Sequence, residues 1–449
     1  MLKRLLILLF LLLVLVACNT TKFVPQGQCL LNDVRIKVQD TKEVLPADLM
    51  KYVQQKQNTE ILGFWKLQLD IYNTAPEDTA KWTSKNARKL GEAPVVFSPE
   101  LADASCTQLK RAMHNKGYFQ AEVDTLMKKK DRKINLTYQI TAKQPYYIGE
   151  YRVLIGENEQ LEQIANNERV MLVHGGMQFD ADMLNQERQR VAQSMRRRGY
   201  YYFDQELLYF VADSNQVSRQ IDVTMRLKDN IEEENVSKVF RRYKVARVYF
   251  HVDYDPARIP DDAEMLANDK GNYIFTWVGK KLIRDNVLIR NCPIRPGDPY
   301  SEAIVERAYA KLNQLAPVKY VDISFEEVSA NELDCHVVLS RGKLNSVSAE
   351  IEGTYSAGDW GVAAGVGYVN RNIFRGAEEF SVNGRASYEW RQNGGPAIEG
   401  KASAELKFPS AVSVNLDYNF QNRPDEYTRN IFGAGLNYAL QQPRVGLRH

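Results

Sequence analysis

The sequence is poor in the residues and motifs that build catalytic or metal centres. Its 449 residues include five cysteines and five histidines, and no Gly-x-Ser-x-Gly, Walker A or dinucleotide-binding fingerprint occurs in it. The stretch "VHGGMQFD" around His174 resembles an oxyanion loop only in its glycines. We therefore expect no catalytic residue, no cofactor and no metal. The histidines lack a zinc-ligand spacing and stand at His114, His174, His251, His336 and His449.

An excess of charge of one sign is also missing. Lys and Arg total 59 against 56 Asp and Glu, a formal net charge of +3. No large field therefore steers the chain toward a polyanion, and nucleic acid is not expected as a partner. The mean hydropathy of −0.43 excludes a helical membrane bundle. It leaves a transmembrane β-barrel open, because the strands of a barrel are half polar.

The long apolar run of the chain stands at its N-terminus, in "MLKRLLILLFLLLVLVAC". Twelve apolar residues follow Lys3 and Arg4, too few to span a bilayer core, which takes ~20 residues of helix. We predict a signal peptide over residues 1–17. The ending resembles a lipobox, which implies diacylation of Cys18, and Asn19 in place of an aspartate leaves passage to the outer membrane open. A plain secretory peptide with a chance cysteine is the alternative.

The other cysteines permit a disulfide framework without defining one. An exported compartment allows disulfides, and four cysteines allow three pairings between which the sequence does not choose. Cys292 and Cys335 with His336 could be called metal ligands, but no paired short spacing supports this. A buried thiol or a structural disulfide is the favoured interpretation for Cys29, Cys106, Cys292 and Cys335.

A helix that ends on glycine recurs along the chain. Apolar residues precede Gly117 at helical spacing (Met113, Leu109), and Met195 and Val191 precede Gly199 in the same way, which predicts two helices with a glycine cap. After each glycine the period becomes two, in "KINLTYQI" and "IDVTMRL", and strand-like runs such as "IGEYRVLI" precede the helices. Each unit therefore reads strand, helices, strand, strand. A third unit follows, from "YKVARVYFHV" through "SEAIVERAYAKLNQL" to "LDCHVVL", without the Gly-Tyr pair.

The stretch "SMRRRGYYYFDQE" invites a nucleic-acid interpretation, but its pattern also occurs around Gly117 without the arginines. We interpret it as a structural joint, with a partner contact as the alternative. Arginines 196–198 are predicted in the last helical turn, where cations meet the carbonyl end of the helix. The aromatic residues are predicted to begin the next strand. The joint residues are Gly117, Tyr118, Phe119, Gly199 and Tyr200.

The C-terminal hundred residues alternate strictly between apolar and polar residues. In "EEFSVNGRASYEW" the apolar set runs from Phe380 to Trp390, and "IEGKASAELKF", "VSVNLDYNF", "VSAEIEGTY", "GVAAGVGY" and, more loosely, "IFGAGLNYAL" continue the pattern. A lipid-facing and a lumen-facing surface explain it. A water-soluble antiparallel sheet has the same alternation and is the alternative.

Together these units resemble the BamA and TamA superfamily of outer-membrane proteins, in which polypeptide-transport-associated (POTRA) repeats precede a barrel. "GVGYVNRNIFRGAEEFSVNG" is similar to the first barrel hairpin of that family, with matches at Asn372, Phe374, Gly376 and Glu378. "ILGFWKLQLDIYN" and "GEAPVVFS" resemble the TamA-like lipoproteins (TamL) of Bacteroidetes type. The resemblance implies α+β POTRA repeats (βααββ) followed by the first strands of an antiparallel transmembrane β-barrel. The predicted segments are a signal peptide at 1–17, a lipidated linker at 18–28, repeats at 29–143, 146–230 and 243–343, and a partial barrel at 345–449.

The resemblance implies a non-enzymatic insertase that binds unfolded outer-membrane client chains through its repeats and inserts them at a barrel seam. It implies an outer-membrane, lipid-anchored location with the repeats in the periplasm, contact with the lipid bilayer, and an inner-membrane partner similar to TamB. A dedicated secretion pore and a lipid-anchored binding scaffold are the alternatives. About six strands are too few for a closed barrel, which takes an even number from ~8 upward, so we expect a truncated or split sequence. Clients, oligomeric state and the binding edges stay open.

Overall fold

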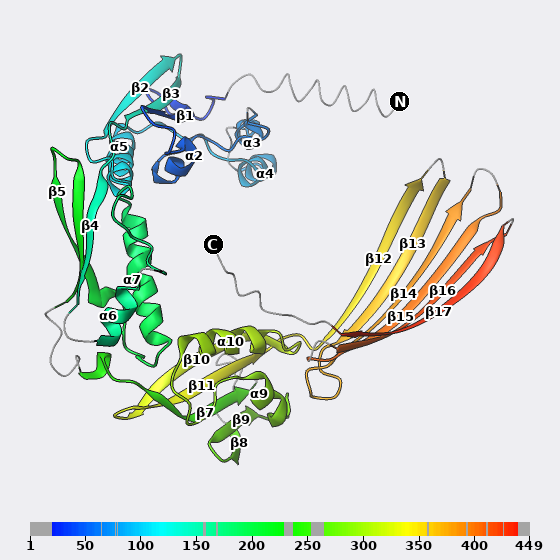
Figure 1. Cartoon of the computed structure of the whole chain (residues 1–449). Helices are drawn as coiled ribbons and strands as arrows, with labels where there is room; N and C mark the ends of the chain where they lie inside the picture. The colour runs from blue at the N-terminus through cyan, green and yellow to red at the C-terminus, as the bar shows by residue number, and fades with distance from the viewer. Residues whose placement is uncertain are drawn as a thin grey trace. The chain divides into compact units, whose positions relative to one another are not determined.

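A computed structural model describes residues 20–438 apart from 64, 77, 79, 156–158, 168, 229–236, 253–264, 357–358, 392–393, 410–411 and 425. By their contacts these residues form two compact units. One holds the described residues up to Val191 together with Gln205–Lys228, and the other holds Ala192–Asp204 with the residues from Asp229 onward. Among the described residues, no helix has the length and apolar character needed to cross a membrane. Figure 1 shows the elements.

The first repeat has the predicted order of strand, helices, strand and strand. Its sheet has the order β1-β3-β2, with β1 parallel and β2 antiparallel to the central strand. Leu109 and Met113 of α5 are fully buried against Leu136 and Tyr138 of β3, as the two periodicities predict. Ser98 caps α5 by accepting a hydrogen bond from Leu101 N. The elements are β1 Leu30–Gln39, α2 Pro46–Leu49, α5 Pro99–Asn115, β2 Glu122–Lys130 and β3 Lys133–Thr141.

An insert of two helices separates α2 from α5. They are α3 (Leu67–Asn73) and α4 (Trp82–Leu90), and the sequence periodicity did not predict them. Gly91 ends α4 against α3, where an added Cβ would lie 2.5 Å from Tyr72 N. Only glycine allows the two helices to approach so closely.

The second repeat has a similar sheet, in the order β4-β6-β5. Leu184, Val191 and Met195 of α7 are buried as predicted. The prediction that the aromatic run after Gly199 begins the next strand is wrong, because β5 begins at Leu208, after the 3-10 turn Gln205–Leu207. The elements are β4 Tyr147–Leu154, α6 Glu159–Ala165, α7 Ala181–Arg196, β5 Leu208–Asn215 and β6 Gln220–Leu227.

The third repeat carries an added β-hairpin. Its sheet has the order β10-β11-β7-β9-β8, and β9 pairs in parallel with β7. The hairpin was not predicted. Ala308 and Leu312 of α10 are fully buried, and Val305 is partly buried on the same core, as predicted. The elements are β7 Lys244–Val252, β8 Met265–Lys270, β9 Tyr273–Val278, α9 Asp285–Asn291, α10 Glu302–Asn313, β10 Val318–Ser329 and β11 Glu332–Arg341.

The six predicted C-terminal strands form one antiparallel sheet in chain order (Figure 1). Paired residues lie on the same face of a sheet, and the register aligns Ile351 with Ala364, Ala386, Gly400 and Phe420. The predicted apolar sets therefore share one face across the strands. The strands are β12 Asn345–Ser356, β13 Asp359–Asn370, β14 Glu379–Trp390, β15 Ala397–Lys407, β16 Val412–Arg423 and β17 Tyr427–Tyr438.

Candidate functional site

The turn between β13 and β14 is docked onto the third repeat. Asn372 Nδ2 donates to the Leu282 carbonyl at 2.7 Å, and Arg284 N donates to the Arg375 carbonyl at 3.0 Å. Ala377 is 3% exposed and belongs to the core of the third repeat. The sheet therefore begins on a turn that the last repeat holds at several points.

Glu378 organises this turn from within. Its carboxylate accepts hydrogen bonds from Gly376 N at 2.8 Å and from Arg284 Nη2 at 3.1 Å, and only 6% of the residue is exposed. A Cβ at Gly376 would overlap this carboxylate. Arg375 and Ala377 adopt φ values of 59° and 62°, a region that costs non-glycine residues ~1–2 kcal/mol. The buried acceptor offsets that local strain.

The four residues predicted from the resemblance to a barrel hairpin are not equivalent in the structure. Asn372 Oδ1 accepts from Ala377 N at 3.1 Å, so Asn372 joins Gly376 and Glu378 in one network. Phe374 instead is 58% exposed. Three of the four predicted residues thus converge, and the aromatic side chain lies outside the network.

The polar face of the sheet is tied together across a strand of small residues. In the middle of β13 this face is formed by Gly361, Ala363, Gly365 and Gly367. Arg385 of β14 reaches over β13 and pairs with Glu352 of β12 at 2.5 Å and with Glu350 at 3.8 Å. A Cβ at Gly365 would lie 2.9 Å from Glu350 Oε1. The small residues therefore leave room for ion pairs between strands that are not neighbours.

The predicted joint at Gly117 connects the first repeat to the second. Gly117 has φ +85°, and a Cβ there would lie 2.7 Å from the Phe179 carbonyl. Its own carbonyl accepts from Tyr146 N at 2.9 Å, and the Tyr146 carbonyl accepts from Phe179 N at 2.9 Å. The Phe119 ring lies 5.2 Å from the Tyr146 ring and 5.3 Å from that of Phe179. Tyr118 is buried in the core of the first repeat.

The joint at Gly199 repeats these contacts. Gly199 has φ +106° and its carbonyl accepts from Tyr243 N at 2.9 Å, while the Tyr243 carbonyl accepts from Tyr300 N at 2.9 Å. Tyr201 takes the place of Phe119, with its ring 5.0 Å from that of Tyr300. Tyr200 is 6% exposed. The aromatic residues are engaged in these contacts, which explains why they do not enter β5.

The arginines beside this joint pair with α10. Arg196 Nε lies 2.9 Å from Glu302 Oε1, and Arg197 Nη2 lies 3.8 Å from Glu306 Oε2. Only Arg196 is within α7, and Arg197 and Arg198 follow its end. Sequence reasoning found the helix end but missed the two glutamates, because they stand about a hundred residues further along the chain.

Each repeat leaves strand backbone unpaired within the described residues. β2, β5 and β10 are edge strands, and Leu126 and Met127 of β2 are 50% and 57% exposed. On the opposite edge, β1 and β4 each have one isolated bridge, whereas β7 is covered by β9. The added hairpin therefore moves this edge of the third repeat from β7 to β8.

Two histidines that are distant in sequence meet on the sheet of the third repeat. His251 Nε2 and His336 Nδ1 lie 3.1 Å apart, and His251 Nδ1 lies 2.7 Å from Thr276 Oγ1. Burial, and then the charge of His336, lower the pKa of His251. Cys335 lies in the core on the opposite face from His336, because successive residues of a strand point to opposite faces. Its thiol forms no disulfide. Within the described residues no group of three or more His, Cys, Asp or Glu side chains is arranged to hold a metal.

Comparison with known proteins identifies a POTRA domain. Residues 33–143 match the family model for POTRA, described as a surface antigen variable number repeat. Comparison with curated proteins finds no match. The chain thus combines a POTRA domain with α+β repeats and a C-terminal antiparallel sheet. Cys18, the predicted lipidation site, lies outside the described residues.

Several solved structures are similar to this chain. POTRA3–5 of BamA from Haemophilus influenzae is 13% identical over 71% of this chain and 99% of its own, with a TM-score of 0.35. BamA from Haemophilus ducreyi lacking POTRA domains 1–3 is 13% identical over 65% of this chain and 58% of its own, with a TM-score of 0.36. CdiB from Acinetobacter baumannii is 13% identical over 64% of this chain and 48% of its own, with a TM-score of 0.30.

Replacing Gly117 with alanine is expected to weaken the joint through a steric overlap. Gly117→Ala places a Cβ on a left-handed backbone conformation, which lowers the free energy of unfolding by ~1–2 kcal/mol. Overlap of that Cβ with the Phe179 carbonyl lowers it by ~1–3 kcal/mol more. Gly176→Ala is the matched control, because its φ is +84° but nothing lies within 4 Å of the added Cβ. The measurement is amide hydrogen exchange of α5 and β4 under increasing urea. Equal losses of protection in both variants would contradict the role of the Phe179 contact.

Replacing Glu378 with alanine is expected to release the turn from the third repeat. The variant loses a charge-assisted hydrogen bond and leaves Gly376 N without its acceptor, a cost of ~2–3 kcal/mol. Phe374→Ala removes a larger but exposed side chain of the same turn and should change stability by no more than ~0.5 kcal/mol. Hydrogen exchange of residues 372–378 reports the release. If Phe374→Ala exposes these amides as much as Glu378→Ala does, the assigned role of Glu378 is wrong.

Proposed function

We propose that this protein is a non-enzymatic component of outer-membrane protein assembly or translocation, of the TamA-like lipoprotein type. It is anchored through a lipid on Cys18, holds its repeats in the periplasm, and binds unfolded outer-membrane client chains. The six C-terminal strands form part of a transmembrane barrel wall, and β12 provides one side of the seam at which a client strand pairs.

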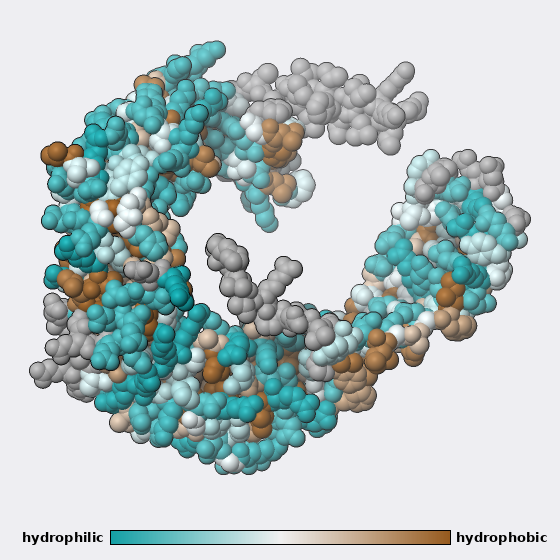
Figure 2. Space-filling view, in the orientation of Figure 1, coloured by the Kyte–Doolittle hydropathy of each residue, from teal (hydrophilic) through white to brown (hydrophobic). Residues whose placement is uncertain are grey.

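One observation carries this proposal: the apolar face of the C-terminal sheet is continuous across its strands. Val347, Ile351 and Phe432 are 79%, 87% and 80% exposed, although burying a side chain of this size stabilises a protein in water by ~1.5–3 kcal/mol. Figure 2 shows apolar side chains at the surface of these strands. A sheet that left this face in water would be prone to association, whereas the hydrocarbon of a bilayer would bury the apolar side chains.

The edge of the same sheet supports client pairing. β12 is hydrogen-bonded to β13 and to no other described strand, and hydrocarbon tolerates unpaired backbone groups poorly. An incoming amphipathic strand brings the same unsatisfied groups, so pairing with β12 satisfies both. No nucleotide is needed, because hydrogen bonding and apolar burial drive the transfer.

The edge strands β2, β5 and β10 provide earlier binding sites for the client by strand addition. The charged end of β2, Lys128 to Lys130, opposes uncontrolled association between copies of the chain. A partner similar to TamB would deliver clients to these edges across the periplasm.

The test is a disulfide crosslink between the seam and a client strand. Ser348 of β12 and Ser403 of β15 lie in one register row through Gly367 and Asn383, so their cysteine variants lie on the same face of the sheet and differ in distance from its edge. Cys29 and Cys106 are replaced by serine. Cys292 and Cys335 remain, because both are buried and burial raises the pKa of Cys292 to about 11.

A nascent outer-membrane strand with one cysteine should crosslink to Ser348→Cys and not to Ser403→Cys. Equal crosslinking at both positions would contradict a seam at β12. Loss of a single secreted soluble protein on deletion of the gene, with no crosslink at position 348, would favour the secretion pore instead.

A further inference from the structure

Helix α4 of the first repeat presents an interfacial face to solvent. Trp82 and Leu90 are 77% and 71% exposed, and Lys85 and Lys89 stand between them at helical spacing, i+3 and i+7 from Trp82. These positions fall on one side of the helix. Ser84 on the opposite side is fully buried and donates to the Pro76 carbonyl at 3.1 Å. Figure 2 shows apolar side chains at the surface of this insert.

This face combines the residue types that favour a bilayer surface. Tryptophan and leucine enter the boundary between headgroups and acyl chains, and lysines beside them attract anionic headgroups. Helix α4 and the preceding Lys81 contain four Lys or Arg and no Asp or Glu. A protein partner of ordinary size would need a wider apolar area than two side chains, which favours lipid as the occupant.

The chain segment before β1 connects this insert to the N-terminus. Phe23 packs edge-on against Tyr72 with ring centres 5.6 Å apart, and the Arg88 guanidinium lies 5.0 Å from the Phe23 ring centre. Lys22 Nζ donates to the Ala75 carbonyl at 2.7 Å, and Arg132 Nη2 donates to the Pro25 carbonyl at 2.7 Å. The segment is therefore fixed on α3 and α4 a few residues after Cys18.

Covalent geometry then limits how far a lipid on Cys18 can lie from α4. Four residues lie between Cys18 and Phe23, so their Cα atoms are five steps apart, and an extended chain spans at most ~3.6 Å per step. The Cα of Cys18 thus lies within ~18 Å of the Cα of Phe23, whose ring contacts Arg88 of α4.

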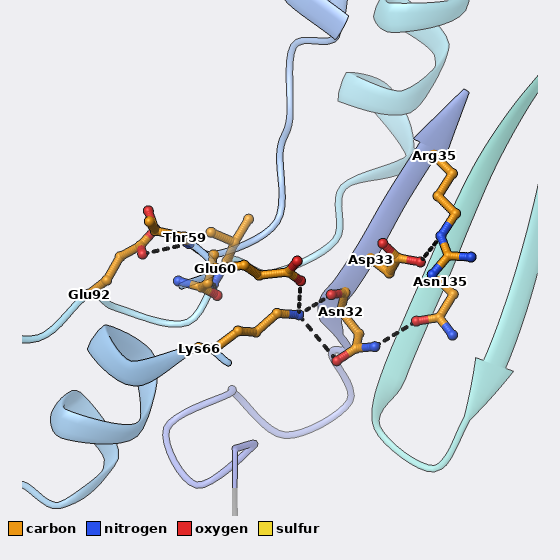
Figure 3. Close-up of polar contacts among 10 residues, drawn as sticks. Asn32, Asp33, Arg35, Thr59, Glu60, Lys66, Glu92 and Asn135 are labelled. Carbon is orange, nitrogen blue, oxygen red and sulfur yellow. Dashed lines mark hydrogen bonds and ion pairs between the residues drawn. The ribbon is translucent and has the colours of Figure 1, made fainter. Parts of the chain in front are cut away.

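Contacts with β1 fix the position of the insert. Lys66 Nζ bonds the Asn32 carbonyl and lies 3.6 Å from Glu60 Oε1 (Figure 3). Asn32 Nδ2 in turn donates to Asn135 Oδ1 of β3 at 2.7 Å. Burial lowers the pKa of Lys66, and Glu60 opposes that shift. The Lys66 ammonium therefore links the insert to the sheet of the first repeat.

We propose that the exposed face of α4, formed by Trp82, Lys85, Lys89 and Leu90, docks on the anionic headgroup layer of the phospholipid bilayer in which the anchor sits. This inference rests on the lipid anchor of the proposed function. The acyl chains on Cys18 attach the chain to the bilayer, and α4 adds an interfacial contact beside that attachment. The first repeat is thereby held against the membrane surface.

The test is quenching of Trp82 fluorescence by lipid in the full-length, lipidated chain. The chain carries Trp360→Phe and Trp390→Phe, which remove the tryptophans of the C-terminal sheet, and is reconstituted in phosphatidylethanolamine vesicles with brominated phosphatidylglycerol. Bromine on the acyl chains should quench this chain, and adding Trp82→Phe should remove at least half of the quenching. Quenching that is equal with and without Trp82 would overturn the proposal.

A charge variant and its matched control identify the headgroup contribution. Lys85→Glu with Lys89→Glu should reduce the quenching severalfold, whereas Lys128→Glu with Lys129→Glu changes the charge of the same repeat equally on β2 and should leave the quenching unchanged. Equal effects of the two pairs would overturn the docking surface. The mass of the mature chain reports acylation of Cys18 separately: an unmodified Cys18 with Trp82 still quenched would refute the anchor while supporting α4 as the docking surface.

Discussion

Unpaired strand backbone is the constraint on which most of this structure depends. Every N–H and C=O group at a sheet edge needs a partner, most stringently in hydrocarbon. In the first two repeats the isolated bridges of β1 and β4 meet part of this need, and in the third repeat β9 pairs with β7 and leaves β8 as the edge strand. At β12 no described strand meets it. Unpaired backbone groups at an edge strand destabilise an isolated fold, but they give a protein that binds other chains a site for strand pairing.

The joints show how one backbone arrangement serves two different sequences. Both glycine carbonyls accept from the residue just before the first strand of the following repeat, Tyr146 or Tyr243. The carbonyl of that residue in turn accepts from Phe179 N or Tyr300 N. The aromatic partner changes from Phe119 to Tyr201. The ion pair changes from Lys116 with Asp180 at the first joint to Arg196 with Glu302 at the second. Backbone hydrogen bonds thus conserve the geometry, while side chains adapt each joint to its neighbours.

Much of the fold could be predicted because it depends on short periods. The faces of α5, α7 and the C-terminal strands follow from spacings of three to four residues or of two. The α3–α4 insert escaped because its helices are short and bury few side chains, Leu69 and Ser84 among them. The β8–β9 hairpin escaped because β9 is defined by its pairing with β7, a contact between distant residues that no local pattern reports.

The sequence identified residues of the candidate site, but it did not predict what most of their side chains contact. Asn372, Gly376 and Glu378 were identified from a motif, but that Glu378 would be buried beside Arg284 depends on the docking of the turn onto the third repeat. The pairing of His251 with His336 depends likewise on β7 and β11 being neighbours. Such contacts arise from tertiary structure, so the local pattern of a single sequence contains no signal for them.

The central claim is that the C-terminal sheet faces lipid on one side and water on the other. Val382 and Asn383 are neighbours in β14 and lie on opposite faces, so a spin label on each in turn measures both environments at the same depth. In reconstituted vesicles the label at 382 should be accessible to oxygen dissolved in the bilayer and protected from a water-soluble nickel complex, and the label at 383 should show the reverse. Equal accessibility of both labels to the nickel complex would contradict a membrane-embedded sheet.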